Sequence, residues 1–209
     1  MDEMETIARA QRGDVSAFNR LVLAYQNLAY NVAYRIMGDA DAAADVCQEA
    51  FLSAFKHIRA LRSSSFKSWL LRIVTNMCYD HLRYQRRRPA HSLEELTTSE
   101  NTGENPEHFS WMTYEGAGPE EQMMSHELAD VLQSGIASLP ADQRAIIVLS
   151  DVQGFTYQEI AEITGIPLGT VKSRLSRARA KLRDYLLAVH PELLPDKYRQ
   201  LIRDEEETI

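Results

Sequence analysis

The sequence lacks the features that mark most secreted, membrane-spanning and metal-dependent proteins. Its 209 residues include only two cysteines, Cys47 and Cys78, which belong to no CxxC pattern and have no paired histidines. We therefore expect two buried thiols rather than a disulfide or a metal site. No apolar run approaches the roughly 20 residues that a membrane span needs, and the acidic start, Met1–Glu5, is unlike a signal peptide. Together these absences predict a cytoplasmic protein that does not insert into a membrane.

Signatures of catalysis and of β-structure are also missing. The six histidines are scattered, and no metal-ligand spacing, phosphate-binding loop or nucleophile elbow is present. We predict no enzymatic activity, no catalytic residue, no metal and no cofactor. No alternating strand pattern appears, whereas apolar residues recur every three to four positions from Phe18 to Ile36, which indicates an amphipathic helix ending at Gly38. Asp39 is the expected N-cap of the next helix, and the predicted fold class is all-α.

Charge is distributed unevenly along the chain. The formal net charge is −7, which by itself argues against a nucleic-acid partner. However, the segment from Gly165 to Arg183 contains six basic residues and no acid, and a second basic group lies at Arg83 and Arg86–Arg88. Between these two groups, the stretch from Ser92 to Gln122 contains eight acidic residues and no lysine or arginine. Basic modules separated by an acidic connector indicate local contacts with nucleic acid.

Proline and glycine divide the chain into two helical domains. A helix over about Phe66–Arg87 should stop before Pro89, because the residue preceding a proline disfavours the helical conformation. Turn-forming residues then accumulate up to Pro119, a composition typical of an interdomain linker. We predict a small helical domain at 1–90, a flexible acidic linker at 91–122, a second small helical domain at 123–190 and a charged tail at 191–209.

The best-defined motif extends from Phe155 to Arg179. Thr156 can cap a short helix, Gly165 suits a sharp turn with a left-handed backbone, and Pro167 favours the start of a second helix. This is the layout of a helix-turn-helix, a DNA-binding motif. A plain helical hairpin with a solvated basic face is the alternative interpretation.

The second helix of this motif has one apolar stripe and one polar face. At 100° per residue, the residues expected to pack inward are Val171, Leu175, Ala178 and Leu182. Small and basic residues on the outer face suit the major groove, and cations on the flanks suit phosphates. The outer and flanking residues are Lys172, Ser173, Arg174, Ser176, Arg177 and Ala180. Arg177 is the best candidate for reading a guanine edge, and Ser173 for a smaller contact.

The predicted helix from Asp39 to His57 presents an acidic strip. Its residues are Asp41, Asp45, Gln48, Glu49, Leu52 and Lys56, opposite an apolar side formed by Cys47, Ala50, Phe51, Ala54 and Phe55. Such a strip fits two interpretations, a solvated surface or a docking face for a basic partner. The residues alone do not decide between them.

The predicted helix from Phe66 to Arg87 carries a mixed aromatic and basic face. This face gathers Trp69, Arg72, Asn76, Tyr79, Asp80 and Arg83, opposite the apolar residues Leu70, Leu71, Val74, Met77, Cys78 and Leu82. Aromatic rings stack on the bases of single-stranded nucleic acid while arginines hold its backbone. The alternative is a surface helix with Trp69 tucked under a neighbouring element.

Three segments together resemble the extracytoplasmic-function (ECF) group of the sigma-70 family of RNA polymerase sigma factors. Asp45–Leu52 is similar to the helix with which that family binds core polymerase, and Phe66–Asn76 to its promoter-melting and −10 recognition region. Gly169–Leu175 resembles the helix that reads the −35 element. The resemblance covers about residues 5–88 and 125–187.

The resemblance implies a protein that binds the β and β′ subunits of core RNA polymerase, recognises the −10 and −35 promoter elements and promotes DNA melting. It places the core-polymerase contacts at Asp41, Asp45, Gln48, Glu49 and Leu52. It places the −10 contacts at Lys67, Trp69, Arg72, Asn76, Tyr79, Asp80, Arg83 and Arg86. It places the −35 contacts at Thr170, Lys172, Ser173, Arg174, Ser176 and Arg177. An anti-sigma factor is a further expected partner, since many relatives are held inactive by one.

A second function fits the helix-turn-helix alone. A transcriptional regulator that acts without polymerase would bind duplex DNA tightly, and its N-terminal domain would serve a ligand or a phosphorylation. The platform formed by Trp69 and Asn76, together with the presence of two basic modules, favours the sigma factor.

Overall fold

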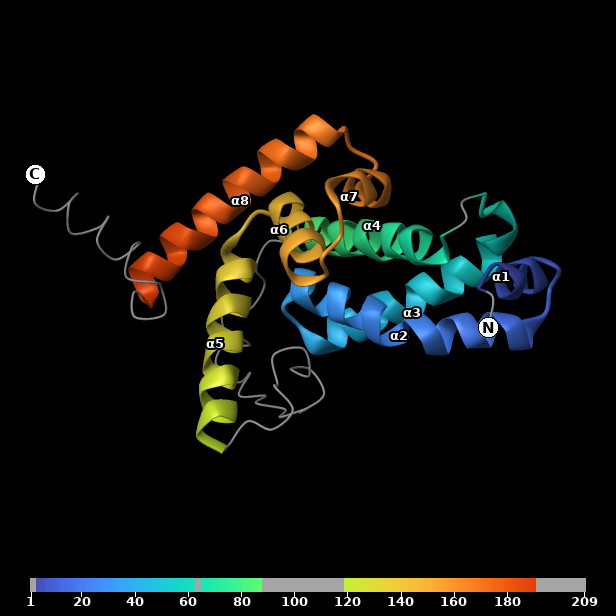
Figure 1. Cartoon of the computed structure of the whole chain (residues 1–209), viewed down its shortest axis with the longest axis horizontal. Helices are drawn as coiled ribbons and strands as arrows, with labels where there is room; N and C mark the ends of the chain where they lie inside the picture. Colours follow the sequence, from blue (N-terminus) through green and yellow to red (C-terminus); the bar gives the residue numbers. More distant parts are fainter. Residues whose placement is uncertain (1–2, 63–64, 88–118, 191–209) are drawn as a thin grey trace, which may run out of the picture.

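The computed structural model describes residues 3–62, 65–87 and 119–190, and all regular elements in these ranges are helical (Figure 1). The N-terminal half contains α1 (Glu3–Gln11), α2 (Val15–Met37), α3 (Ala40–His57), the 3₁₀ turn η1 (Ile58–Ala60) and α4 (Phe66–Arg87). The C-terminal half contains α5 (Pro119–Ser138), α6 (Ala141–Ile147), the π-helical turn η4 (Val148–Val152), α7 (Tyr157–Thr164) and α8 (Leu168–Val189). The predicted all-α fold class is confirmed.

The predicted linker and tail fall largely outside the described residues. Helix α5 begins at Pro119, inside the stretch 91–122 that the sequence assigns to the linker. The charged tail at 191–209 and residues 88–118 are not described. Among the helices that are described, none combines the length and the apolar character needed to cross a membrane.

Capping residues define the helix ends of the N-terminal half. Gly38 ends α2 in the left-handed conformation, at φ 77°, and Asp39 caps α3 by accepting a hydrogen bond from the Ala42 N–H at 2.7 Å. Both ends agree with the sequence prediction. Asp14 caps α2 in the same way, by accepting from the Ala17 N–H at 3.0 Å.

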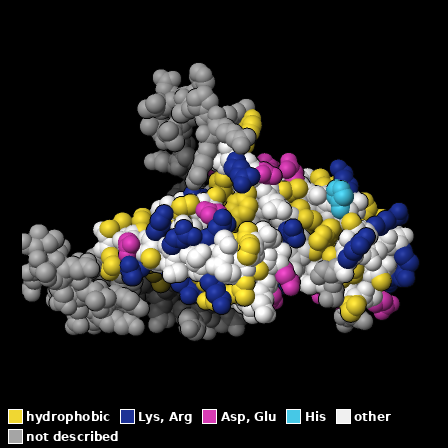
Figure 2. Space-filling model, turned by 90° about the horizontal axis from the view of Figure 1, so that it is seen from above, with side chains coloured by type: hydrophobic (Ala, Val, Ile, Leu, Met, Phe, Trp, Pro, Cys, Tyr) yellow, Lys and Arg dark blue, Asp and Glu magenta, His cyan; other side chains and the backbone are white. Residues whose placement is uncertain are grey.

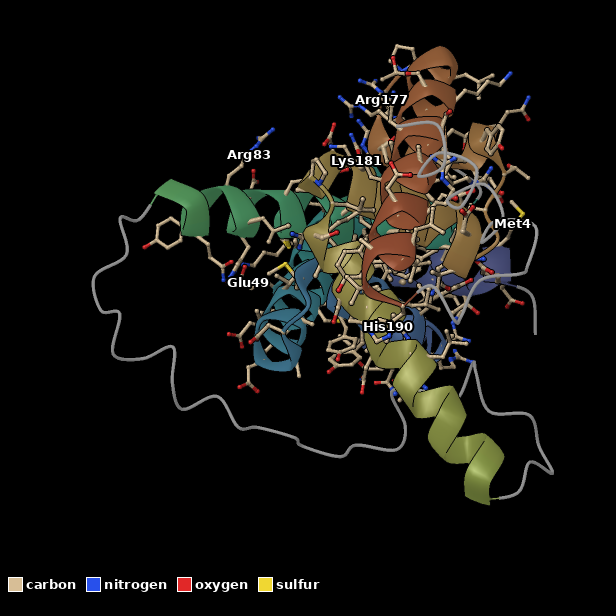
Figure 3. The ribbon with its side chains drawn as sticks, turned by 90° about the vertical axis from the view of Figure 1, so that its left-hand side faces the viewer. Met4, Glu49, Arg83, Arg177, Lys181 and His190 are labelled. Atoms are coloured by element: carbon tan, nitrogen blue, oxygen red, sulfur yellow. The ribbon has the colours of Figure 1, made fainter. Side chains whose placement is uncertain are left out.

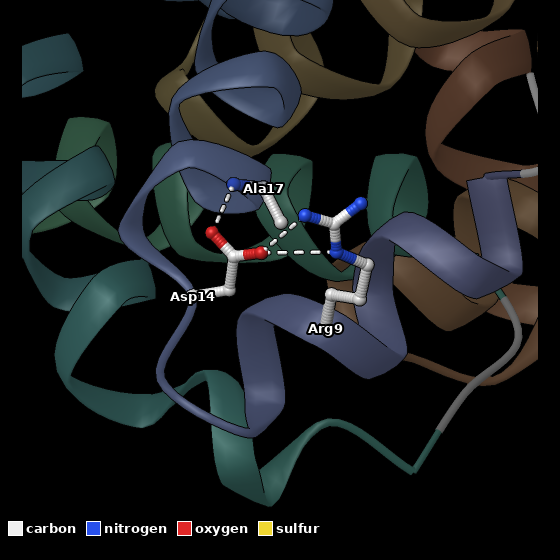
Figure 4. A network of polar contacts seen from close by, with 3 residues as sticks. All are labelled: Arg9, Asp14 and Ala17. Atoms are coloured by element: carbon white, nitrogen blue, oxygen red, sulfur yellow. Dashed lines mark hydrogen bonds and ion pairs between the residues drawn. The ribbon is translucent and has the colours of Figure 1, made fainter.

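The carboxylate of Asp14 also joins α1 to α2. Its Oδ2 lies 2.6 Å from Nη2 of Arg9 (Figure 4). The hydrogen bond from Ala17, followed by that from Arg9, lowers the pKa of Asp14 below its ordinary value. The sequence does not predict this cap, because the apolar pattern becomes visible only at Phe18, after the helix has begun.

Helices α2, α3 and α4 pack around a common core. The apolar side predicted for α4 is buried at Leu70, Leu71, Val74, Cys78 and Leu82. Helix α3 contributes mainly small residues, which permit close helix approach: Ala43, Val46, Cys47, Ala50 and Ala54. Phe55 was expected on the same buried side but is 44% exposed, and its ring packs edge-on against Phe18 with centroids 5.0 Å apart.

The core continues without a break into the C-terminal half. Buried residues of α6 and η4, including Ile146, Val148 and Leu149, belong to the same cluster as those of α2 and α4. Helix α7 lies against α4, and α5 and α6 reach the C-terminal end of α2 (Figure 1). The sequence predicts two small domains but gives no sign of this packing between them.

Candidate nucleic-acid and polymerase interfaces

The helix-turn-helix predicted from the sequence is present in α7 and α8. Thr156 caps α7 in a reciprocal capping box: its Oγ1 accepts from the Glu159 N–H at 3.3 Å, and a Glu159 carboxylate oxygen accepts from the Thr156 N–H at 2.8 Å. The hydrogen bonds from Thr156 lower the pKa of Glu159. Gly165 ends α7 at φ 69° and donates its N–H to the Ala161 carbonyl at 2.9 Å. The left-handed turn therefore requires the glycine predicted there.

The second helix of the motif, α8, packs against the rest of the protein through the apolar stripe that the sequence predicts. Val171, Leu175 and Ala178 are buried, and Leu182 is half-buried. The opposite face leaves Lys172, Ser173, Ser176 and Arg177 exposed, with Thr170 half-buried beside them. Lys and Arg side chains are spread over the face of the molecule that carries this helix (Figure 2).

Within the described part of the chain, Arg177 and Ser173 form hydrogen bonds with their own helix. The Arg177 Nε donates to the Ser173 carbonyl at 3.2 Å, and the Ser173 hydroxyl donates to the Thr170 carbonyl at 3.1 Å. Figure 3 shows Arg177 projecting away from the body of the protein. Among the described residues, these hydrogen bonds therefore leave both side chains on the outer face of α8.

Two other arginines of α8 have partners in the protein. Nε of Arg174 lies 3.2 Å from Oδ2 of Asp142, and the Arg174 side chain is 30% exposed. Arg179 donates two hydrogen bonds to Asp151, at 2.8 and 2.6 Å. Burial is the largest single influence and raises the pKa of Asp151, but the hydrogen bonds from Arg179 and Ser150 and the charge of Arg179 together outweigh it, so the net shift is downward. In the sequence Arg179 is simply part of a basic run, whereas in the structure it connects α8 to η4.

The aromatic and basic face of α4 is partly exposed. Arg72, Asn76, Asp80 and Arg83 are exposed, and Figure 3 shows Arg83 projecting from the helix. Trp69 and Tyr79 are half-buried. We call the seven described members the −10 face: Lys67, Trp69, Arg72, Asn76, Tyr79, Asp80 and Arg83. The side chain of Arg86, the eighth predicted −10 residue, lies outside the described residues.

Trp69 fits both interpretations of α4, a stacking surface and a surface helix with its tryptophan tucked under a neighbour. Its ring packs against Phe66, with centroids 5.9 Å apart, and it borders the core. It nevertheless remains partly exposed. A half-buried ring is rigidly held, which suits a surface on which a base stacks.

The acidic strip of α3 faces solvent along its whole length. Asp41, Asp45, Gln48 and Glu49 are all exposed, and Leu52 is 53% exposed. We call these five residues the acidic face. The face thus combines carboxylates with one exposed leucine at its C-terminal end.

The two thiols are buried, as predicted. Burial raises the pKa of Cys47 to about 11 and that of Cys78 to about 12. Within the described ranges, histidine, cysteine and carboxylate side chains form no cluster suited to hold a metal ion.

A capped helix-turn-helix with outward-facing basic residues defines a DNA-binding protein. The chain belongs to the sigma-70 family of RNA polymerase sigma factors: the models for sigma-70 region 2 and for sigma-70, region 4 match residues 21–88 and 129–182. Relatives that are themselves ECF sigma factors assign the chain to the ECF group of that family, as the resemblance in the sequence indicated.

Two relatives and one solved structure illustrate the likeness. The chain is 35% identical over 182 residues to the ECF RNA polymerase sigma factor SigW of Bacillus subtilis, covering 86% of this chain and 94% of the relative. It is 38% identical over 174 residues to the ECF RNA polymerase sigma-E factor of Escherichia coli, covering 83% and 88%. The sigma factor RpoE, solved in complex with the anti-sigma factor NepR from Bartonella quintana, matches with a TM-score of 0.57 and 27% identity, covering 83% of this chain and 98% of that one.

Proposed function

We propose that this ECF sigma factor binds core RNA polymerase through α3, melts and reads the −10 element with α4, and reads the −35 element with α8. The observation that carries the proposal is that all three faces are present on one chain, each on a different helix and each at least partly exposed. The chemistry of RNA synthesis then belongs to the polymerase, and the chain acts in the cytoplasm without enzymatic activity of its own.

The acidic face supports docking on core polymerase. Asp45, Gln48 and Glu49 lie on the exposed side of α3, and burial of Leu52 in a partner would remove apolar surface from water. Complementary charge speeds encounter and fixes orientation. We assign this face to the β′ subunit, with further contacts of the chain to β.

The −10 face supports capture of an unpaired strand. Trp69 and Tyr79 offer aromatic surface, Asn76 offers an amide, and Arg72 and Arg83 offer positive charge. Extruding a base from the duplex costs a few kcal/mol, which stacking and hydrogen bonding on such a surface can offset. The same residues therefore read the strand and hold it open.

The recognition helix supports reading of a duplex element. Arg177 has the reach for a guanine edge, Ser173 for a smaller contact, and Lys172 for a phosphate. Thr170, Arg174 and Ser176 complete the proposed −35 set. The proposed organisation assigns core and −10 binding to residues 1–90 and −35 binding to residues 123–190.

An anti-sigma factor is a proposed partner. The support is the similarity to a sigma factor that was solved bound to its anti-sigma factor. A complex between this chain and a protein encoded beside it would agree with this assignment.

Binding to core polymerase tests the role of α3. Asp45→Arg reverses one charge on the acidic face, and we expect it to weaken binding of the full chain to core polymerase about tenfold or more, because close charge pairs across interfaces couple by about 1.5 kcal/mol or more. The matched control is Glu5→Arg, which makes the same charge change at an exposed position of α1. Equal affinity of the two variants would remove the acidic face from the interface.

A further inference from the structure

A groove runs along α8, on the side of that helix that faces α6, η4 and α7. Its volume is about 590 Å³, and its apolar lining comes mainly from Ile147, Leu175, Leu182 and Leu186. Ile147 and Leu175 are buried, whereas Leu182 and Leu186 are half-buried. The described residues therefore leave part of this apolar lining open to solvent.

The same groove is lined by cations. Lys172, Arg179 and Arg183 line it, and Asp151 is the one carboxylate beside them among the described residues. Arg179 is bound to Asp151, at 2.8 and 2.6 Å. Arg183 lies 2.7 Å from the adjacent Asp184, and both side chains are at least half exposed, so this ion pair is weak. Lys172 has no ion pair with the described residues, so Lys172 and Arg183 are available to a further carboxylate.

The groove shares residues with the surface proposed to read the −35 element. Lys172 and Ser176 line the groove and also belong to the proposed −35 set. A carboxylate bound to Lys172 from the groove would neutralise a cation that is proposed to hold a DNA phosphate. Occupation of the groove by an acidic group should therefore compete with binding of DNA to α8.

The sequence beyond α8 carries groups complementary to this lining, in residues that the structure does not describe. Tyr198, Leu201 and Ile202 recur at the three- and four-residue spacing of one face of a helix. Four consecutive acids follow at 204–207, with no cation between them. We call residues 198–207 the tail segment, in which an apolar part is followed by an acidic part.

The order of the two parts matches the groove when the chain folds back along α8. Followed backwards from the end of α8, the groove presents Leu186 and Leu182 first, then Arg179, and finally Lys172. A tail segment antiparallel to α8 would bring its apolar part to the leucines and its acids to the cations. Lys172 lies 18 residues before His190, which is about 27 Å along a helix. The first acid lies 14 residues beyond His190 and can reach at most about 46 Å, so the chain is long enough.

We propose that the tail segment binds in this groove and competes with DNA for α8. Its acids pair with Lys172 and Arg183, and its apolar side chains pack against Leu182 and Leu186. Because the segment is tethered to α8, its effective concentration is roughly millimolar, and individually weak contacts suffice to hold it. The effect on −35 binding rests on the proposed function, whereas the docking of the tail segment does not.

Carbodiimide crosslinking of the full-length wild-type protein tests the docking. The reagent joins a lysine to a carboxylate that is in contact with it. Lys181 is the internal control, because it is exposed on the same helix and nearer to the tail segment but does not line the groove (Figure 3). At low salt, we expect peptides that link Lys172 to residues 204–207 to be at least about fivefold more abundant than those that link Lys181 to them, as read by mass spectrometry. Equal abundance, or more links to Lys181, would overturn the docking.

An equal mixture of isotope-labelled and unlabelled protein shows whether the tail segment comes from the same chain. Links within one chain join two labelled or two unlabelled peptides, whereas links between chains also join one of each. We expect fewer than about one tenth of the Lys172 links to be mixed, since tethering favours the segment of the same chain. A mixed fraction of about one half would assign the groove to a second copy and overturn the proposal.

Neutralising the acids of the tail segment tests the competition with DNA. The tail variant carries Asp204→Asn, Glu205→Gln, Glu206→Gln and Glu207→Gln. The matched control makes the same change of net charge elsewhere in the chain, with Glu94→Gln, Glu95→Gln, Glu100→Gln and Glu104→Gln. Without polymerase and at low salt, we expect the tail variant to bind a −35 duplex from a promoter that the holoenzyme transcribes at least about threefold tighter than the control, because the competent fraction rises. Equal affinities would overturn the competition. If the holoenzyme transcribes no promoter, the proposed function falls, and the Lys172 links of the wild-type protein still decide the docking.

Discussion

At the residue scale, basic side chains of α8 divide into two kinds. Arg179 is fixed by two hydrogen bonds to Asp151 and serves the packing of the helix-turn-helix. Arg177 is exposed, and among the described residues its side chain donates to the Ser173 carbonyl of its own helix. Sequence alone cannot separate them, because the partner of Arg179 lies 28 residues away and depends on the π-helical turn that carries it.

Replacing Arg177 should change specificity. Arg177→Ala should reduce discrimination at one base of the −35 element by about 1–3 kcal/mol, since a bidentate contact to guanine contributes about that much. Selection of binding sites from a randomised −35 library by the holoenzyme measures this. Lys172→Ala provides the comparison, with a nearly uniform loss across sequences. A uniform loss for Arg177→Ala as well would mark it as a phosphate contact.

The thiols supply a test of burial in the N-terminal half. Because the thiolate is the reactive form and the pKa of Cys47 is about 11, only roughly one molecule in a thousand carries the Cys47 thiolate at pH 8, and fewer carry that of Cys78, whose pKa is about 12. Iodoacetamide should therefore label neither residue in the native protein at this pH and both in concentrated urea, as read by mass spectrometry. Labelling of the native protein at the rate seen in urea would contradict the packing of α3 against α4.

At the scale of elements, helix ends were the most predictable feature. Asp39, Thr156 and Gly165 precede or follow clear apolar patterns, and all three act as the caps that the sequence indicated. The buried face of α8 also follows from the sequence, because its buried apolar residues recur every three to four positions. The close approach of α5 to α8 was not predictable, since it depends on the shape of side chains from separate segments.

Gly135 makes that approach possible. A Cβ at this position would lie 2.6 Å from Cδ1 of Leu182 and 3.0 Å from Cδ1 of Tyr185. Overpacking costs about 1–3 kcal/mol, and alanine offsets up to about 1 kcal/mol of this through its helix propensity, so Gly135→Ala should lower the free energy of unfolding by up to about 2 kcal/mol. Gly169→Ala is the matched control, because a Cβ there meets nothing within 4 Å and alanine favours the helix by up to about 1 kcal/mol.

Urea unfolding of the two glycine variants gives the comparison directly. The midpoint for Gly135→Ala should fall below that of the wild type, and the midpoint for Gly169→Ala should be equal or higher. The close packing of α5 on α8 would be refuted by equal midpoints for both variants.

At the scale of the whole molecule, the sequence predicts the parts better than their arrangement. The all-α class, the helix-turn-helix and the exposure of the acidic face were all expected and are present. The interface between the halves was not, because contacts such as Arg35 with Gln133 join residues 98 positions apart and leave no periodic signal.

Transcription by a reconstituted holoenzyme tests the central claim most directly. Purified wild-type protein is combined with core polymerase on genomic DNA, and the 5′ ends of the transcripts are sequenced. We predict a set of start sites that is absent with core polymerase alone and that shares one pair of elements near −10 and −35. A start-site profile identical to that of core polymerase alone would contradict the assignment as a sigma factor.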